Sequence, residues 1–92
     1  MIEGTTSNGF RYSIAEHALD DMELLDALVD MDEGNAKGYK NAVTALLGED
    51  QRKRLYDFLR NKKTGRVSAK AVTTAFADIL KDASDNNKAV KN

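Results

Sequence analysis

The chain has 92 residues, of which 41% are hydrophobic and 32% charged, and its formal net charge at pH 7 is −1. This balance predicts one globular domain, and a nearly neutral chain has no overall electrostatic attraction to nucleic acid or to an anionic membrane. The sequence has no cysteine, which excludes disulfides, thiolate metal sites and cysteine nucleophiles. Its first residues, MIEGTTSNGF, do not resemble a signal peptide, and no apolar stretch approaches the roughly 20 residues that span a bilayer. We therefore expect a cytoplasmic protein without a membrane segment.

Residues 1–14 predict a β-hairpin. Asn8 and Gly9 form the dipeptide that most favours a two-residue turn, because both residues tolerate positive φ. The flanking segments, 2–5 and 10–14, contain the β-branched and aromatic residues that favour strands. A lone two-stranded hairpin is only marginally stable in water, so we expect it to pack against the helices that follow.

The first helix is predicted at 20–33, where Asp20 and Glu23 fit a capping box and Gly34 provides a C-terminal cap. Its apolar residues fill about half of the helix circumference, which is wider than one packed neighbour requires. Either this helix lies at the centre of the fold, or part of its apolar arc contacts a partner. The arc consists of Met22, Leu24, Leu25, Leu28, Val29 and Met31.

Two further helices are predicted at 36–47 and 49–60. Asn35 is the N-cap of the first of them, and Gly38 within its first turns should weaken it by roughly 1 kcal/mol relative to alanine. Glu49 is the first residue of the next helix, where the positive end of the helix dipole stabilises an acidic side chain.

The last helix is predicted at 69–82. Ser68 is its N-cap, and Val67 and Val72 form a hydrophobic staple across the cap. Residues 83–92 have almost nothing to bury, so we expect a flexible tail there.

The predicted fold is mostly α: four short helices in a compact bundle, with the hairpin packed on one side, in a single domain over residues 1–82. The core prediction follows from the apolar side chains that share a helix face at about 100° per residue. The predicted core residues are Met22, Leu25, Leu28, Val29, Tyr39, Val43, Leu46, Leu55, Phe58, Leu59, Val67, Val72, Phe76, Ile79 and Leu80.

Two segments, 30–41 and 60–71, partly follow the rhythm of a calcium-binding loop. Such a loop needs acidic or amide ligands at its first, third and fifth positions, then a glycine, and a bidentate glutamate at the last position. In the first segment the last position is Asn41, and in the second Arg60 and Lys62 occupy the first and third positions. Both segments are therefore interpreted as helix-capping loops rather than calcium sites.

The sequence offers no clear catalytic group. His17 is the only histidine, and without a second histidine or a cysteine it cannot complete a transition-metal site. The carboxylates are expected in water, where no burial separates their pKa values for acid–base work. No glycine-rich phosphate-binding loop is present. We expect neither an enzyme nor a bound cofactor.

The charges are unevenly distributed along the chain. No lysine or arginine lies between Arg11 and Lys37, where eight acidic residues stand, whereas 52–66 is strongly basic. This layout is either ordinary surface charge or a basis for complementary contact, with copies of the same chain or with a charged helical partner. The residues that we expect at such contacts are Leu24, Asp26, Asp30, Met31, Arg52, Arg54, Arg60, Lys62, Lys63 and Arg66.

A second hypothesis is a small nucleic-acid-binding regulator of a phage or prophage that uses the basic segment 52–66. The last two helices would then form a helix-turn-helix. Their connection, RNKKTGRV, exceeds the usual turn of about 3–4 residues, and Asp78 makes the exposed face of the last helix a poor reader of the major groove. We therefore favour a protein partner.

Three runs, ALDDMELLDALVDMDEGN, LLGEDQRKRLYDFLR and GRVSAKAVTTAFADIL, resemble small tail assembly chaperones of phages and prophages of Gram-positive bacteria. The matching features are the acidic LDD.ELL opening, the LLG..Q junction and the GRV before the last helix, within residues 10–80. The resemblance implies a non-enzymatic helper in the bacterial host cytoplasm that covers the long helical tape-measure protein, recruits tail-tube subunits and then leaves.

Overall fold

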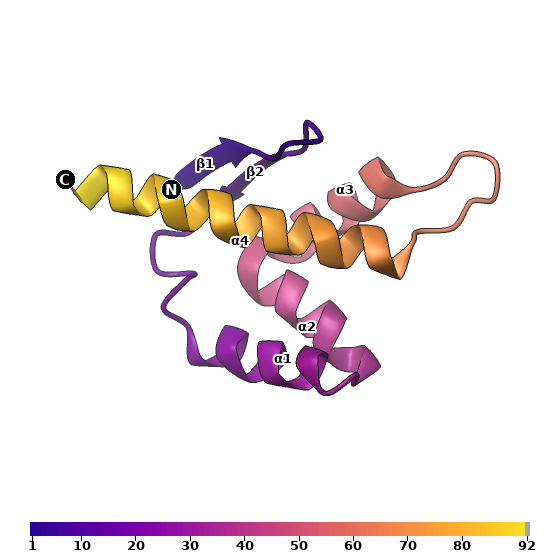
Figure 1. Cartoon of the computed structure of the whole chain (residues 1–92), viewed down its shortest axis with the longest axis horizontal. Helices are drawn as coiled ribbons and strands as arrows, with labels where there is room; N and C mark the ends of the chain where they lie inside the picture. The colour runs from indigo at the N-terminus through magenta and orange to yellow at the C-terminus, as the bar shows by residue number, and fades with distance from the viewer. Residues whose placement is uncertain (92) are drawn as a thin grey trace.

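The computed structural model describes the backbone of residues 1–91 and the side chains of residues 1–85. It confirms the predicted fold class, because four helices follow an N-terminal antiparallel hairpin (Figure 1). The elements are β1 (Ile2–Thr5), β2 (Arg11–Ile14), α1 (Met22–Asp32), α2 (Ala36–Leu47), α3 (Glu49–Leu59) and α4 (Ala69–Lys91).

The last helix is longer than predicted. We expected it to end at residue 82, but α4 continues to Lys91, and Ala83 is a fully buried core residue. Ala83 follows Ile79 by four residues and Phe76 by seven, so it continues the apolar face of the helix. The predicted helix end at residue 82 is therefore wrong, and the core includes one residue beyond it. Asn92, the last residue of the predicted tail, lies outside the described residues.

The hairpin turn differs from the predicted two-residue turn. Gly9 has a φ of 95°, but within residues 1–91 no residue other than glycine has positive φ, so Asn8 does not adopt the predicted conformation. The turn is instead closed by Thr6, whose backbone nitrogen donates to the carbonyl of Phe10 while its hydroxyl oxygen accepts from the Phe10 nitrogen. Thr6 is buried and adds a side-chain hydrogen bond that the dipeptide pattern did not indicate.

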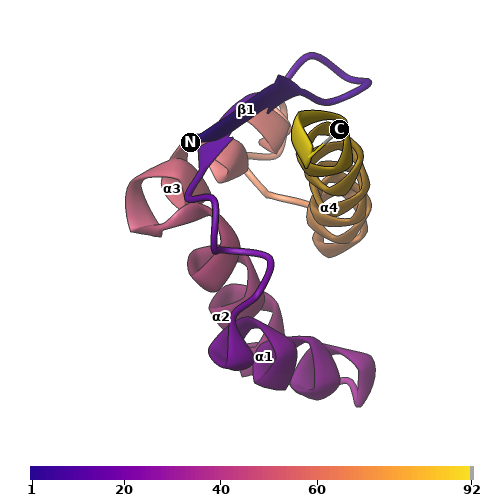
Figure 2. The ribbon, with the colours of Figure 1, turned by 90° about the vertical axis from the view of Figure 1, so that its left-hand side faces the viewer.

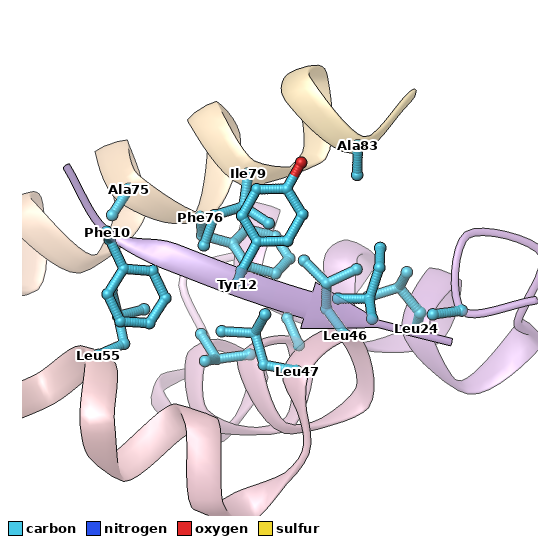
Figure 3. Packing of buried hydrophobic residues seen from close by; sticks show 14 of the residues in the cluster. Phe10, Tyr12, Leu24, Leu46, Leu47, Leu55, Ala75, Phe76, Ile79 and Ala83 are labelled. Atoms are coloured by element: carbon cyan, nitrogen blue, oxygen red, sulfur yellow. The ribbon is translucent and has the colours of Figure 1, made fainter. Parts of the chain in front are cut away.

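The hairpin lies along α4, and both supply the centre of the core. Figure 3 shows Phe10, which directly precedes β2, and Tyr12 of β2 facing Phe76 and Ile79 of α4, with Leu55 of α3 beside Phe10. Two aspartates of α4 hold the hairpin in place. Asp78 accepts from the Ser7 backbone nitrogen at 3.0 Å and from the Ser7 hydroxyl at 2.8 Å, and Asp82 accepts from the Tyr12 hydroxyl. These polar contacts flank an apolar interface.

The outer side of β2 contacts α3 through Gln51. The backbone nitrogen of Ser13 donates to Gln51 Oε1 at 2.8 Å, and Gln51 Nε2 donates to the carbonyl of the same serine. Gln51 Nε2 also donates to the carbonyl of Leu47 at 2.7 Å, which fixes the amide at the start of α3. One side chain thus satisfies both backbone groups of Ser13.

The core prediction is confirmed in part. The buried members of the predicted list are Val43, Leu46, Leu55, Val72, Phe76 and Ile79. The partly buried members are Leu28, Tyr39, Leu59, Val67 and Leu80. The prediction is wrong for Met22, Leu25, Val29 and Phe58, which are exposed. Phe58 packs edge-on against Phe10, with ring centroids 5.4 Å apart, and leaves its other side in solvent.

Helices α1 and α2 form a pair that extends away from α4 (Figure 2). Gly38, in the first turns of α2, allows their close approach: a Cβ atom there would lie far inside contact distance of the Met31 nitrogen and 2.7 Å from the Asp30 carbonyl carbon. The helix-weakening glycine predicted from the sequence is thus a packing requirement. Within residues 1–91, no element other than α2 makes more than slight contact with α1.

Candidate interaction surface

The outer face of α1 carries three large apolar side chains. Met22 is 66% exposed, and Leu25 and Val29 are each 52% exposed. Their spacing of three and then four residues places them in one row along the helix, because each turn contains about 3.6 residues. We call these three residues the α1 stripe. The stripe occupies about two turns of the helix.

The opposite side of α1 is the buried one. Leu24 is 3% exposed and Ala27 is 4% exposed, and both belong to the core cluster. Figure 3 shows Leu24 pointing toward Leu46 of α2. Because α2 is the one described element that packs extensively against α1, the core covers only half of the apolar arc. The sequence left open whether this helix is central or has an uncovered part of its apolar arc. In the structure, part of the arc is uncovered.

This arrangement changes the residues assigned to a partner contact on α1. Leu24, which we expected at the exposed part of the arc, is buried and cannot reach a partner. Met31 is partly buried and packs against the core cluster. Met22, Leu25 and Val29, which we had assigned to the core, are the exposed residues instead. Periodicity identified the apolar arc but could not show which half of it α2 covers.

An acidic hollow lies beside the α1 stripe. It has a volume of about 460 Å³ and opens between α1 and α2. Its lining residues are Asp21, Glu23, Asp26, Ala27, Asp30, Asn41, Thr44 and Ala45. Among the described residues, no lysine or arginine forms an ion pair with these four acids. The predicted contact residues Asp26 and Asp30 thus lie together in this hollow.

The basic segment is less free than its sequence indicates. Arg52 has a side chain only 11% exposed, forms an ion pair with Glu49 at 3.6 Å and lies 5.5 Å from the centre of the Tyr56 ring. Arg54 lies 4.7 Å from the centre of the Phe10 ring.

Arg60 is also engaged within the molecule. It pairs with Asp57 at 3.2 Å, and its Nη1 donates to the Gly65 carbonyl at 2.9 Å. The side chains of Arg52, Arg54 and Arg60 therefore make contacts inside the chain.

The other three cations of the predicted site, Lys62, Lys63 and Arg66, are exposed on the loop between α3 and α4, which projects from the body in Figure 1. The loop is shaped by Asn61, whose side-chain oxygen accepts from the nitrogens of Lys63 and Thr64. A β-bridge between residues 60 and 67 closes its base. This projecting loop is not the short turn of a helix-turn-helix.

The remaining chemistry of the site is limited. His17 is exposed in the connection between β2 and α1. The described residues contain no group of three or more histidine, aspartate or glutamate side chains placed to hold a metal ion. Within residues 1–91, no helix combines the length and the apolar character that crossing a bilayer requires.

The comparisons with known proteins give no relative for this chain. No protein-family model matches the sequence, and neither a curated protein nor a solved structure matches it.

Proposed function

We propose that this protein is a non-enzymatic interaction module that binds a helical segment of a partner protein through the α1 stripe. The observation that carries the proposal is the row of three large apolar side chains on a helix with one packed neighbour. An amphipathic partner helix presents apolar side chains at the same spacing, and a helix-in-groove contact would bury both rows.

The size of the α1 stripe supports reversible binding. Full burial of one Val, Leu or Met side chain contributes about 1.5–3 kcal/mol, and these three are already partly covered. Completing their burial therefore contributes on the order of 1 kcal/mol each. Such a gain is modest beside the entropic cost of association, so additional contacts are needed for tight binding. A weak, releasable contact suits a helper that must leave its client.

The resemblance to tail assembly chaperones supplies a candidate client. A phage tape-measure protein is a long helix with apolar segments that would aggregate when uncovered. A second molecule of this protein, bound farther along that helix through its own α1 stripe, would shield more of it. We therefore propose the tape-measure protein as the partner, with the tail-tube protein as a further one.

The test is co-expression of the full chain with a helical fragment of a tape-measure protein, followed by a pull-down. A Leu25→Lys/Val29→Lys double variant places charge in the α1 stripe, so we expect it to lose the fragment while its circular-dichroism melting curve stays close to that of the wild type. Ala77→Lys, at an exposed position of α4, is the matched control and should retain the fragment. Retention by the double variant, or no retention by folded wild type, would refute the proposal.

The nucleic-acid hypothesis depends on the three loop cations Lys62, Lys63 and Arg66, since the other three are engaged within the chain. Duplex DNA binding that weakens steeply with salt, and that a triple alanine variant at these positions abolishes, would favour it. We expect no such binding, because three phosphate contacts supply little affinity at physiological salt.

A further inference from the structure

We propose that the α1 surface selects a basic amphipathic helix, one whose apolar row is flanked on one side by lysine or arginine. This inference rests on the proposed function and specifies the chemistry of its partner. It follows from the relation between the α1 stripe and the acidic hollow beside it.

The acids of α1 form a second row parallel to the stripe. Glu23, Asp26 and Asp30 each follow a stripe residue by one position, so the acidic row has the same spacing as the apolar row. The row lies on the side of the stripe that faces the hollow. On the other side stand the partly buried Leu28 and, at the last residue of the helix, Asp32. The charge flanking the stripe is therefore concentrated on one side.

Among the described residues, the acids of this row form no ion pair. The side of the hollow formed by α2 contributes Asn41, Thr44 and Ala45, none of which is charged. Thr44 Oγ1 is buried and has no hydrogen-bond partner among the described residues. Cations on a docked helix would gain attraction from several carboxylates at once, whereas acids there would be repelled.

A second copy of the chain fits this surface less well. Its exposed loop cations belong to the segment NKKTGR, residues 61–66, which carries no large apolar side chain. That loop would neutralise the acidic hollow but leave the α1 stripe in water. A partner that satisfies both rows needs apolar and basic residues in register on one helix, so we assign the surface to a partner helix.

The test uses the full-length protein and three synthetic helical peptides of about 18 residues, or roughly five turns. The peptides share one apolar row and differ only on one flank, which carries lysine, glutamine or glutamate. We expect the lysine peptide to bind about tenfold more tightly than the glutamine peptide at low salt, and the glutamate peptide to bind most weakly. This preference should shrink as salt is added, because salt screens exposed charges.

A charge-reversed protein gives the decisive comparison. Glu23→Lys/Asp26→Lys changes two exposed residues of the acidic row and should shift the preference to the glutamate peptide. Asp50→Lys, at an exposed position of α3, should keep the wild-type preference. Glu23 stabilises the N-terminus of α1, so its replacement by lysine can unfold the protein. In that case a Glu23→Gln/Asp26→Asn variant replaces the charge-reversed one, and it should reduce the preference for the lysine peptide.

The outcomes separate this inference from the proposed function. Equal binding of all three peptides would overturn the inference and leave the helix-binding proposal intact. Failure of every peptide to bind folded wild type would overturn both. Self-association of the protein alone, detected by sedimentation and abolished by Asp26→Lys, would overturn the inference by showing that a second copy fills the hollow.

Discussion

Helices α1 and α4 are both amphipathic, but they stand in different surroundings. The apolar row of α4 includes Val72, Phe76 and Ile79, and all three are buried under the hairpin and α3. The α1 stripe has comparable residues at comparable spacing and remains about half exposed or more. The difference arises from the number of neighbours, since α1 packs mainly against α2. An apolar helix face thus serves folding in one region and is available for binding in the other.

The comparison predicts that truncating a side chain lowers the free energy of unfolding much more in α4 than in the α1 stripe. Phe76→Ala should lower the free energy of unfolding by about 3–5 kcal/mol, because it leaves a cavity in the centre of the core. Leu25→Ala in the α1 stripe should change it by no more than about 0.5 kcal/mol, because the side chain is half in water already. Urea denaturation followed by circular dichroism measures both. A loss above about 2 kcal/mol for Leu25→Ala would mean that the stripe contributes to the fold.

The packing of α1 against α2 can be tested at Gly38. Helix propensity alone predicts that Gly38→Ala stabilises α2 by roughly 1 kcal/mol. We expect the opposite sign, a loss of about 1–3 kcal/mol, because the added Cβ would collide with the backbone of α1. Amide hydrogen exchange should accelerate in α1 more than in α4. The control is Lys40→Ala, at an exposed position of the same helix. A stabilised Gly38→Ala protein would show that the two helices can separate without loss.

The smallest expected effect is a pH dependence at α4. Hydrogen bonds from the Ser7 backbone nitrogen, then from the Ser7 hydroxyl, lower the pKa of Asp78; burial opposes this shift and the charge of Lys81 adds to it. Because the pKa is lower in the folded state, the stabilisation is present above the unfolded pKa and is lost as the pH falls through the folded pKa.

The corresponding measurement is the free energy of unfolding as a function of pH for wild type and Asp78→Asn. Wild type should be the more stable at neutral pH, and its advantage should shrink below about pH 4, where the carboxylate gains a proton. Parallel curves over this range would mean that Asp78 does not stabilise the hairpin turn through its charge.

The sequence predicted the elements better than it predicted their surroundings. Asn35 caps α2 as expected, and Ser68 accepts a hydrogen bond from the nitrogen of Ala71 in the first turn of α4. Such capping is local, so a few neighbouring residues suffice to predict it to within one position. The predicted cap Asp20 is wrong by one residue, since Asp21 caps α1 and accepts from the Glu23 nitrogen. The packing role of Gly38 was hidden because it depends on the position of α1. The buried side chain of Ala83 was missed for a different reason, since a small residue in a polar segment gives little signal.

Only two of the predicted contact residues, Asp26 and Asp30, belong to the candidate surface on α1. The acids at 26 and 30 lie together, and the wide apolar arc left open two arrangements, of which the structure shows the one with an uncovered face. The covered half of that arc could not be predicted, since this depends on the rotation of α1 against α2. The contact of Arg54 with the Phe10 ring was also missed, because these two residues meet only in the folded chain. The pair of Arg52 with Glu49 spans three residues of one helix and could have been found from the sequence.

The amide of Gln51 has a consequence for the protein in a crowded cell. A two-stranded sheet exposes unpaired peptide groups along its outer border, and these invite another chain to add a strand and begin aggregation. By offering one donor and one acceptor to Ser13, the glutamine side chain substitutes for a peptide unit of a third strand. The hairpin is therefore blocked at that position against the addition of another strand.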